Sequence, residues 1–392
     1  MSRLYRNKNI IMLGQVNCML SSISSFREYT RKKVTGMDVG IMAIEARGDA
    51  YEFGRKQAEA LQETPLFNRH LKRRKKSIRR YSTDVQETEK WVKSLSPALW
   101  EEMHGLAEGL EWRLWDIIHE YGGYQQSWKK SGCSALMKNG IYGRNYDYHP
   151  KTYDGRFVLW QPEKGYAHIG FAQRIIGRMD GMNEHGLALG YHFVNRISPE
   201  DGFICCSIAR FILDSCRNVQ EASELLQELP HRHSFNYSMT DARGTSAVVE
   251  GSAKGAVILN NDEGVCTNHF RSADKLKENR HKIIESTARM EKLVKYRKQS
   301  ENAGDIYRIL NDLDKGIAKT DYGNWSGTIH SAVYDTRSLR VLAGIGPDAK
   351  PAAVSFSDWL KGERFRIKKL RGRISHTEEA GHLESAREEK IK

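Results

Sequence analysis

"SGCSALMKNGIYGRNYDYHP", Ser131–Pro150, combines a strong hairpin signal with reactive side chains. Asn139-Gly140 joins "CSALMK" to "IYGRNYDY", and this dipeptide favours the tight turn between two antiparallel strands. The turn folds the second run back along the first, so we expect Arg144 and Asp147 to lie near Cys133. The alternative is an inert buried thiol beside a surface ion pair.

Blocks of strands and helices alternate after this hairpin. Strands are expected in "YAHIGFAQRIIGRMDGMNEHGLALGYHFV", and two helices follow, "ICCSIARFILDSC" and "NVQEASELLQEL". A meander, "SFNYSMTDARGTSAVVEGSAKGAVILNNDEGVCTNHF", precedes a charged helical stretch and a last hairpin, "GTIHSAVYDTRSLRVLAGIG". This order fits an α+β fold in which two antiparallel sheets pack together with helices outside, a four-layer αββα sandwich.

The N-terminal third is predicted to be mainly helical. "VGIMAIEA" favours a strand and "AYEFGRKQAEALQE" a helix, and helical periodicity then continues to about Tyr121. Ser96 and Pro97 form a typical helix start. We therefore divide the chain into a weakly ordered lead (1–36), a helical segment packed on the same core (37–132), the sandwich (133–360) and a charged tail (361–392).

Composition bounds the class of protein and its cofactors. With 39% hydrophobic and 28% charged residues, and no apolar run of about 20, we expect no membrane span. Six cysteines in 392 residues form no disulfide framework, so reduced thiols and a cytoplasmic location are the simpler interpretation. Neither Gly-x-Gly-x-x-Gly nor Gly-Lys-Ser/Thr occurs, and His231 and His233 lack a third ligand, so we expect neither a nucleotide cofactor nor a metal.

Positive charge is concentrated in two runs. "RHLKRRKKSIRR" (69–80) and "KGERFRIKKLRGR" (361–373) hold 15 of the 62 basic residues in a chain of net charge +13. Such runs form solvated surfaces or bind anionic polymer or membrane. Because no aromatic residues alternate with the charges in the first run, we do not expect nucleic-acid binding. The expected partner is a small-molecule substrate, and a homo-oligomer is left open.

Cys133 could act as a nucleophile without a separate histidine base. A cysteine nucleophile needs nearby positive charge and a base to take its proton. If the Gly132–Cys133 peptide bond is cleaved, the new α-amino group, with an ordinary pKa near ~7.7–8.0, becomes that base. Gly132 has no Cβ and so tolerates the strained backbone that attack on its own carbonyl requires. Arg144 would favour the thiolate, and Asp147 would orient the new α-ammonium.

These residues resemble a known family. "GRNYDY" after a strand-initial Cys, then "DGMNEHGL", "VCTNHF" and "TIHSAVYD", resembles the N-terminal-nucleophile (Ntn) amidohydrolases of the choloylglycine hydrolase superfamily. The closest branch is the acyl-coenzyme A:6-aminopenicillanate acyltransferase family, and "GDAYEFG" matches its upstream "G-x-x-Y-E-x-G" motif. The resemblance covers about Met37 to Pro347 and implies the same αββα fold.

The resemblance implies a set of roles. Cys133 would be the nucleophile freed by autocleavage after Gly132, Arg144 and Asp147 would be the family's arginine and aspartate, and Asn268 would help to hold the oxyanion. Bile salt hydrolases have an asparagine in the strand after "MNE-x-GL", where this chain has "GYHF". An oxyanion donor there would have to be His192 or backbone N–H groups, and Tyr148 is a candidate pocket residue.

The implied activity is that of a self-activating cysteine amidohydrolase or acyltransferase. It would act on linear amides or acyl thioesters without a cofactor. The alternative is a catalytically silent module of the same fold whose basic surface binds anionic polymer or membrane.

Overall fold

The computed structural model describes residues 36–128, 132–260, 263–280, 282–375 and 378–384. All but the last residue of the predicted lead over 1–36 lies outside the described residues. The strands are β1 (Met37–Gly48), β2 (Gly132–Lys138), β3 (Ile141–Tyr148), β4 (Arg156–Pro162), β5 (His168–Gln173), β6 (Gly177–Asn183), β7 (Ala188–Asn195), β8 (Ser234–Thr240), β9 (Ser246–Ser252), β10 (Gly255–Asn260), β11 (Val265–Cys266), β12 (Thr320–Asp321), β13 (Ser326–Asp335), β14 (Arg340–Ile345), β15 (Ala352–Ser355) and β16 (Lys369–Ile374). The α-helices are α2 (Ala50–Gln62), α3 (Leu66–Ser77), α4 (Val85–Leu95), α5 (Pro97–Gly109), α6 (Leu114–Tyr121), α7 (Cys205–Ser215), α8 (Val219–Glu228), α9 (Ile284–Gln299), α10 (Ala303–Asn311) and α11 (Phe356–Leu360).

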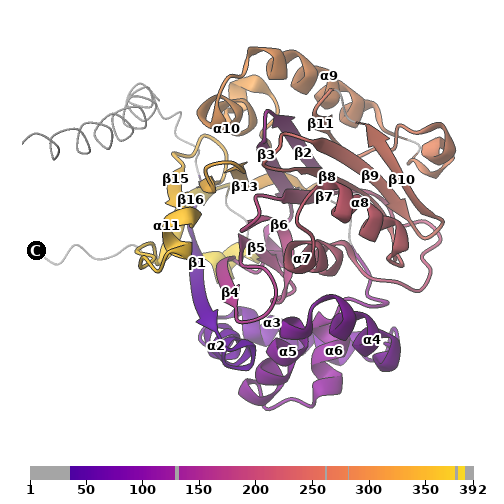
Figure 1. Ribbon diagram of the computed structural model, residues 1–392, viewed down its shortest axis with the longest axis vertical. Helices are drawn as coiled ribbons and strands as arrows, with labels where there is room; N and C mark the ends of the chain where they lie inside the picture. Colours follow the sequence, from indigo (N-terminus) through magenta and orange to yellow (C-terminus); the bar gives the residue numbers. More distant parts are fainter. Residues whose placement is uncertain (1–35, 129–131, 261–262, 281, 376–377, 385–392) are drawn as a thin grey trace, which may run out of the picture. The chain divides into compact units, whose positions relative to one another are not determined.

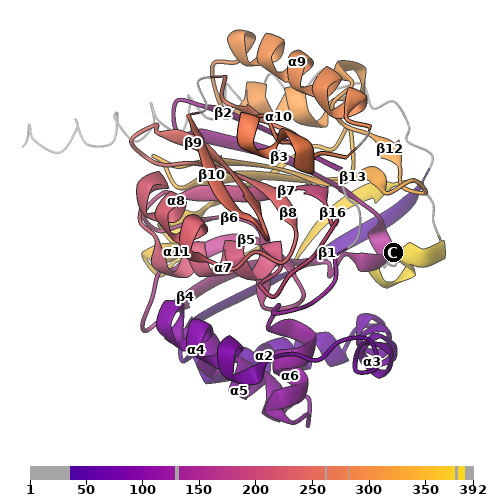
Figure 2. The same cartoon turned by 90° about the vertical axis from the view of Figure 1, so that its right-hand side faces the viewer.

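The strands form two packed layers with helices on both outer sides (Figure 1). β2 and β3 pack against β7 and β8, while α7 and α8 cover the outer side of β6–β10 and α9 and α10 cover β2, β3 and β13. Figure 2 shows the same succession of layers from the side. The predicted αββα sandwich is therefore confirmed.

The two layers differ from the prediction in being parts of one hydrogen-bonded sheet. The strand order runs β10-β9-β8-β7-β6-β5-β4-β1-β16-β14-β13-β3-β2-β11. β1 and β16 connect the layers, and the pairs β1–β4 and β14–β16 are parallel. Strands of the N-terminal and C-terminal segments thus complete the sandwich, a pairing that local hydrophobic patterns cannot specify.

β16 lies within the residues that the sequence assigned to a charged tail. It pairs antiparallel with β1 in a register that places Leu370 opposite Ile41 and Ile374 opposite Met37. Leu370 and Ile374 are buried, while Lys369 and Arg371 between and beside them are exposed. The high charge density of "KKLRGRI" conceals this alternation of exposed and buried positions.

The N-terminal helices join the sandwich through buried polar contacts. Ser96 caps α5 as predicted, with its Oγ accepting the Leu99 N–H, and it also donates to Asp214 in α7 at 2.5 Å. Arg210, also in α7, donates to Glu102 of α5 at 2.8 Å and to Asp214 at 2.8 Å. Because all these side chains are buried, α5 and α7 are held together by charge-assisted hydrogen bonds.

Candidate active site

The β2–β3 hairpin sorts the candidate residues onto two faces. Asn139 and Gly140 form its turn with φ of 52° and 77°, as the Asn-Gly signal predicts. The register pairs Cys133 with Tyr146, and Gly132 with Asp147. Since successive side chains of a strand alternate, Cys133, Arg144, Tyr146 and Tyr148 share the face that packs on β7 and β8. Asp147 is on the other face, beside the start of β2 and toward α9.

Arg144 lies directly against the thiol. Its Nη2 is 3.3 Å from Cys133 Sγ, and the same nitrogen donates to the Tyr191 carbonyl. Its Nη1 donates to Asp180 Oδ2 at 2.6 Å and to the Met179 carbonyl at 2.5 Å. These contacts fix the guanidinium, which is fully buried, at the sulfur.

Asp180 anchors Arg144 through a buried polar cluster. His330 Nε2 lies 2.8 Å from Asp180 Oδ2, and Tyr334 donates to Asp180 Oδ1 at 2.6 Å. Burial alone would raise the pKa of Asp180, but His330, Arg144 and Tyr334 together lower it to about 2. Asp180 is thus a carboxylate at neutral pH and a fixed counter-charge for Arg144.

The thiol itself is held in its neutral form in the uncleaved chain. Burial raises the pKa of Cys133, and the adjacent Arg144 opposes only part of that increase. The backbone N–H of Cys133, which cleavage would turn into the α-amino group, donates to Asn268 Oδ1 at 2.9 Å. The nitrogen of the proposed base therefore already has a defined acceptor.

Asn268 is positioned at both ends of its side chain. Its Nδ2 donates to the Phe193 carbonyl at 2.9 Å, and its backbone N–H donates to Ser286 Oγ at 2.8 Å. In the uncleaved chain the amide oxygen of Asn268, rather than its nitrogen, faces Cys133. The structure thus brings Asn268 to Cys133.

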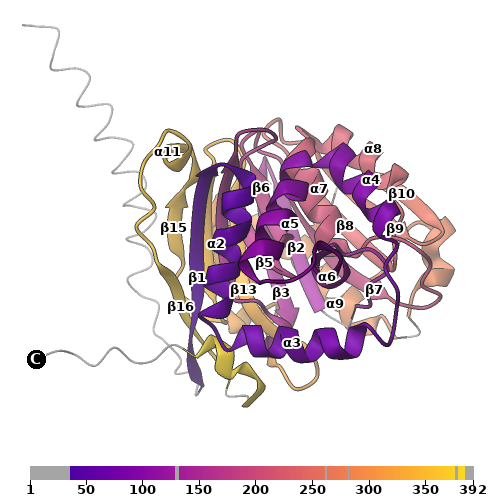
Figure 3. The same ribbon diagram turned by 90° about the horizontal axis from the view of Figure 1, so that it is seen from below.

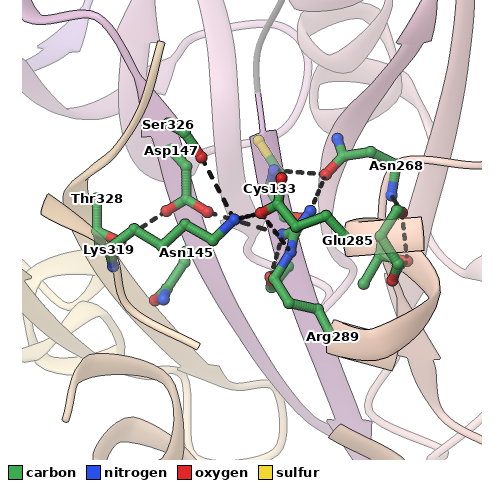
Figure 4. Close-up of polar contacts among 12 residues, drawn as sticks. Cys133, Asn145, Asp147, Asn268, Glu285, Arg289, Lys319, Ser326 and Thr328 are labelled. Atoms are coloured by element: carbon green, nitrogen blue, oxygen red, sulfur yellow. Dashed lines mark hydrogen bonds and ion pairs between the residues drawn. The ribbon is translucent and has the colours of Figure 1, made fainter. Parts of the chain in front are cut away.

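Arg289 of α9 is a site residue that sequence reasoning missed. Its Nη1 donates to the Cys133 carbonyl at 2.9 Å and to Ser134 Oγ at 2.7 Å, and its Nη2 donates to Asn268 Oδ1 at 2.8 Å. Figure 4 shows Arg289 and Asn268 converging on Cys133. A sequence signal did exist, because Ser286, Arg289 and Leu293 form the buried stripe of α9, where an arginine is unusual.

Asp147 occupies a buried position beside Gly132. Its Oδ1 accepts a hydrogen bond from Thr328 Oγ1 at 2.7 Å, while its Oδ2 has no hydrogen-bond partner among the described residues. Arg289 Nη1 lies 3.8 Å from that Oδ2. Burial raises the pKa of Asp147, and Arg289 and Lys319 oppose the rise. The Oδ2 of this carboxylate can therefore accept a hydrogen bond from a further donor.

His192 and Tyr148 flank the site on its inner face. His192 Nε2 lies 2.7 Å from Ser238 Oγ, and Nδ1 has no hydrogen-bond partner within the described part of the chain. Burial, with Arg144 adding to it, lowers the pKa of His192 well below its ordinary value, so the ring is neutral at neutral pH. Tyr148 packs its ring on Trp128 and Trp325, with centroids 6.1 and 5.4 Å away.

The described residues lack two kinds of feature. No group of three or more His, Cys, Asp or Glu side chains there is arranged to hold a metal ion. Among the helices of the same residues, none has the length and apolar character needed to cross a bilayer. His231 bonds the Leu226 carbonyl and His233 the Trp128 N–H, so each has a structural partner.

Comparison with known proteins gives one family and several distant structures. Penicillin V acylase from Agrobacterium tumefaciens has a TM-score of 0.43 and 19% identity, over 58% of this chain and 86% of that chain. A variant of conjugated bile acid hydrolase from Clostridium perfringens has a TM-score of 0.45 and 15% identity, over 63% and 98%. The Caenorhabditis elegans ortholog of N-acylethanolamine-hydrolyzing acid amidase has a TM-score of 0.35 and 12% identity, over 53% and 93%. No curated protein matches the chain.

The family model of acyl-coenzyme A:6-aminopenicillanic acid acyl-transferase matches residues 135–346, more than half of the 392 residues. Gly132 and Cys133 precede the matched segment. The chain belongs to the acyl-coenzyme A:6-aminopenicillanic acid acyl-transferase family.

Proposed function

We propose that this protein is a self-activating cysteine amidohydrolase or acyltransferase that acts on linear amides or acyl thioesters. One observation carries the proposal. Cys133 is the second residue of β2, and it has Arg144 Nη2 3.3 Å from its sulfur and Asn268 Oδ1 2.9 Å from its backbone nitrogen. A cation at the thiol and an acceptor at the future amine are what a nucleophile that serves as its own base requires.

Activation would cleave the Gly132–Cys133 bond. Cys133 Sγ attacks the Gly132 carbonyl carbon, a C–S bond forms, the C–N bond breaks, and the thiol proton passes to the Cys133 nitrogen. Water then hydrolyses the thioester, which leaves a carboxylate on Gly132 and a free thiol and amine on Cys133. Asp147, opposite Gly132 in the hairpin register, would orient the new ammonium group.

Turnover would repeat this chemistry on a substrate. The α-amino group takes the thiol proton as sulfur attacks the substrate carbonyl, and the same proton leaves with the amine or thiol that is expelled. Water or an acceptor amine then takes the acyl group from Cys133. Arg144 favours the thiolate in both halves of the cycle, because its charge opposes the effect of burial on the thiol pKa.

The oxyanion would be held by side chains that surround Cys133. We assign this role to Asn268, whose Nδ2 would have to leave the Phe193 carbonyl, and to His192, whose Nδ1 lacks a partner among the described residues. Tyr148 is assigned to the pocket wall. The five cysteines of the described residues are free thiols, which supports the assignment to the cytoplasm.

The test is to trap the acyl-enzyme. Purified protein is mixed with an N-acyl para-nitroanilide and quenched in acid, and the masses of its chains are measured. The proposal predicts an acyl adduct on the fragment that begins at Cys133. The adduct should be absent in Cys133→Ala and retained in Cys216→Ala, a control that removes another buried thiol, at the C-terminal end of α7. If a panel of acyl donors leaves every variant unmodified, the proposal fails and the silent binding module replaces it.

A further inference from the structure

A basic pocket lies between α3 and the sandwich. It has a volume of about 540 Å³, within the ~300–1,000 Å³ usual for small-ligand sites. α3 and the turn that follows it contribute Arg69, Lys72, Arg73, Lys76 and Arg80. In Figure 3, α3 runs crosswise to α2. The predicted basic run therefore presents one of its faces to a concave site instead of only to solvent.

The charge in this pocket is far from balanced. The sandwich adds Lys151 and Arg174. Among the described residues, the only carboxylate in the lining is Asp154, whose Oδ2 accepts the Ile175 N–H at 2.7 Å. Lys72, Lys76 and Arg80 are exposed and have no carboxylate partner among the described residues. Three such cations at one cavity favour a ligand with more than one negative charge.

Two buried donors in the lining also lack acceptors. Trp128 Nε1 and Arg73 Nη2 have no hydrogen-bond partner in the part of the chain that the structure describes. The Trp128 side chain is 3% exposed, and Arg73 already pairs with Glu120 through Nε at 2.9 Å. Buried donors without partners are uncommon, and the oxygens of a bound anion would satisfy them.

The pocket adjoins the candidate active site. Trp128 and Tyr148 form part of its wall, and the ring of Tyr148 lies 5.6 Å from that of Tyr146. Tyr146 is the register partner of Cys133, and Arg144 Cζ lies 5.1 Å from its ring centroid. The contacting rings of Tyr148 and Tyr146 thus connect the pocket wall to the strand partner of Cys133.

We propose that this pocket binds a phosphate group of the substrate, so that the enzyme takes amides phosphorylated at one end. The inference rests on the proposed function for the reaction at Cys133, and on the pocket alone for the anion. Phosphate matches the site because its doubly charged form accepts several hydrogen bonds, from guanidinium forks and from ammonium groups alike.

Binding is tested on a chain that cannot perform acyl chemistry. Full-length Cys133→Ala protein is titrated with inorganic pyrophosphate by calorimetry at low salt. Lys72→Ala/Lys76→Ala removes two charges from the pocket, and Lys75→Ala/Arg79→Ala removes two from exposed positions of the same run outside it. We expect the first pair to weaken binding at least about tenfold and the second by less than about twofold. Absent binding, or equal losses in the two pairs, overturns the proposal.

Substrate choice is tested on the active enzyme. N-octanoyl ethanolamine and its phosphate ester differ only in the phosphate, so we expect kcat/KM to favour the ester at least about tenfold. Lys72→Ala/Lys76→Ala should lower kcat/KM for the phosphate ester to the value for the neutral amide and so abolish that preference. Equal turnover of the two amides by the wild type overturns the proposal.

A vesicle experiment distinguishes the two possible sources of the phosphate, a lipid headgroup and a soluble ester. Co-sedimentation with phosphatidate vesicles that depends on Lys72 and Lys76 assigns the site to a lipid headgroup, and pyrophosphate binding without co-sedimentation assigns it to a soluble ester. If both variant pairs lose co-sedimentation equally, the binding comes from nonspecific surface charge, and the proposal of a phosphate-binding pocket is overturned. Because pyrophosphate binding does not require Cys133, its failure is distinguishable from failure of the acyl chemistry.

Discussion

Gly190→Ala should slow self-cleavage by displacing Arg144 from the thiol. Gly190 lies in β7 opposite Asp180, and a Cβ there would be 2.6 Å from Arg144 Cδ and 2.6 Å from Tyr142 Oη. Ordinary van der Waals contact begins at 3.4 Å, so the arginine has to move by about 0.8 Å. Such a shift would lengthen the 3.3 Å contact between Nη2 and Sγ to about 4 Å. A misplacement of ~1 Å in a catalytic group costs up to about 100-fold in rate.

The assay follows the appearance of the two fragments after synthesis in a cell-free system, by denaturing gel. We expect a 10- to 100-fold slower cleavage, within the range cited for such displacements. The matched control is Gly344→Ala in β14, whose Cβ would collide with Tyr307 of α10, away from Cys133. Overpacking at either position costs about 1–3 kcal/mol of stability. Equal slowing in both variants, or normal cleavage in Gly190→Ala, would refute the reasoning.

Three further outcomes follow from the same contacts. Asn268→Ala should slow acyl transfer about 10²–10³-fold in a steady-state assay, and an unchanged rate would remove it from the oxyanion site. Burial alone would raise the pKa of Asp214, but Arg210 and His168 lower it to about 2. Asp214 therefore contributes about 2 kcal/mol to the free energy of unfolding above about pH 4, and this contribution is lost as the pH falls through 2. In urea unfolding, Asp214→Asn should lose this acid dependence. Identical pH profiles of the wild type and the variant would contradict it. After cleavage the two fragments should elute together in gel filtration, because β1 pairs with β4 and β16; separation without denaturant would contradict this.

The hairpin was predictable because its determinants are local. Asn139-Gly140 sets the turn, the turn sets the register, and the register brings Arg144 to Cys133 across 11 residues. The same short-range logic places Ser96 at the start of α5 and Asn218 at the start of α8, where its side chain accepts the Glu221 N–H. Turns and helix caps of this kind are determined by residues that are close in the sequence.

The remaining site residues were hidden by sequence distance. Arg289 reaches the Cys133 carbonyl from 156 residues away, and Asp180 meets His330 across 150. Neither contact is implied by periodicity, because each depends on how the layers of the sandwich stack. β16 was hidden differently, since its buried Leu370 and Ile374 lie among basic residues that resemble a solvated tail.

The central claim is that Cys133 becomes an N-terminal nucleophile. Its most direct test is the intact mass of the purified protein under denaturing conditions, measured beside Cys133→Ala. The account predicts two fragments that meet between Gly132 and Cys133 in the wild type and one full-length chain in the variant. A full-length wild-type chain whose Cys133 also resists a thiol-directed acylating probe would contradict it.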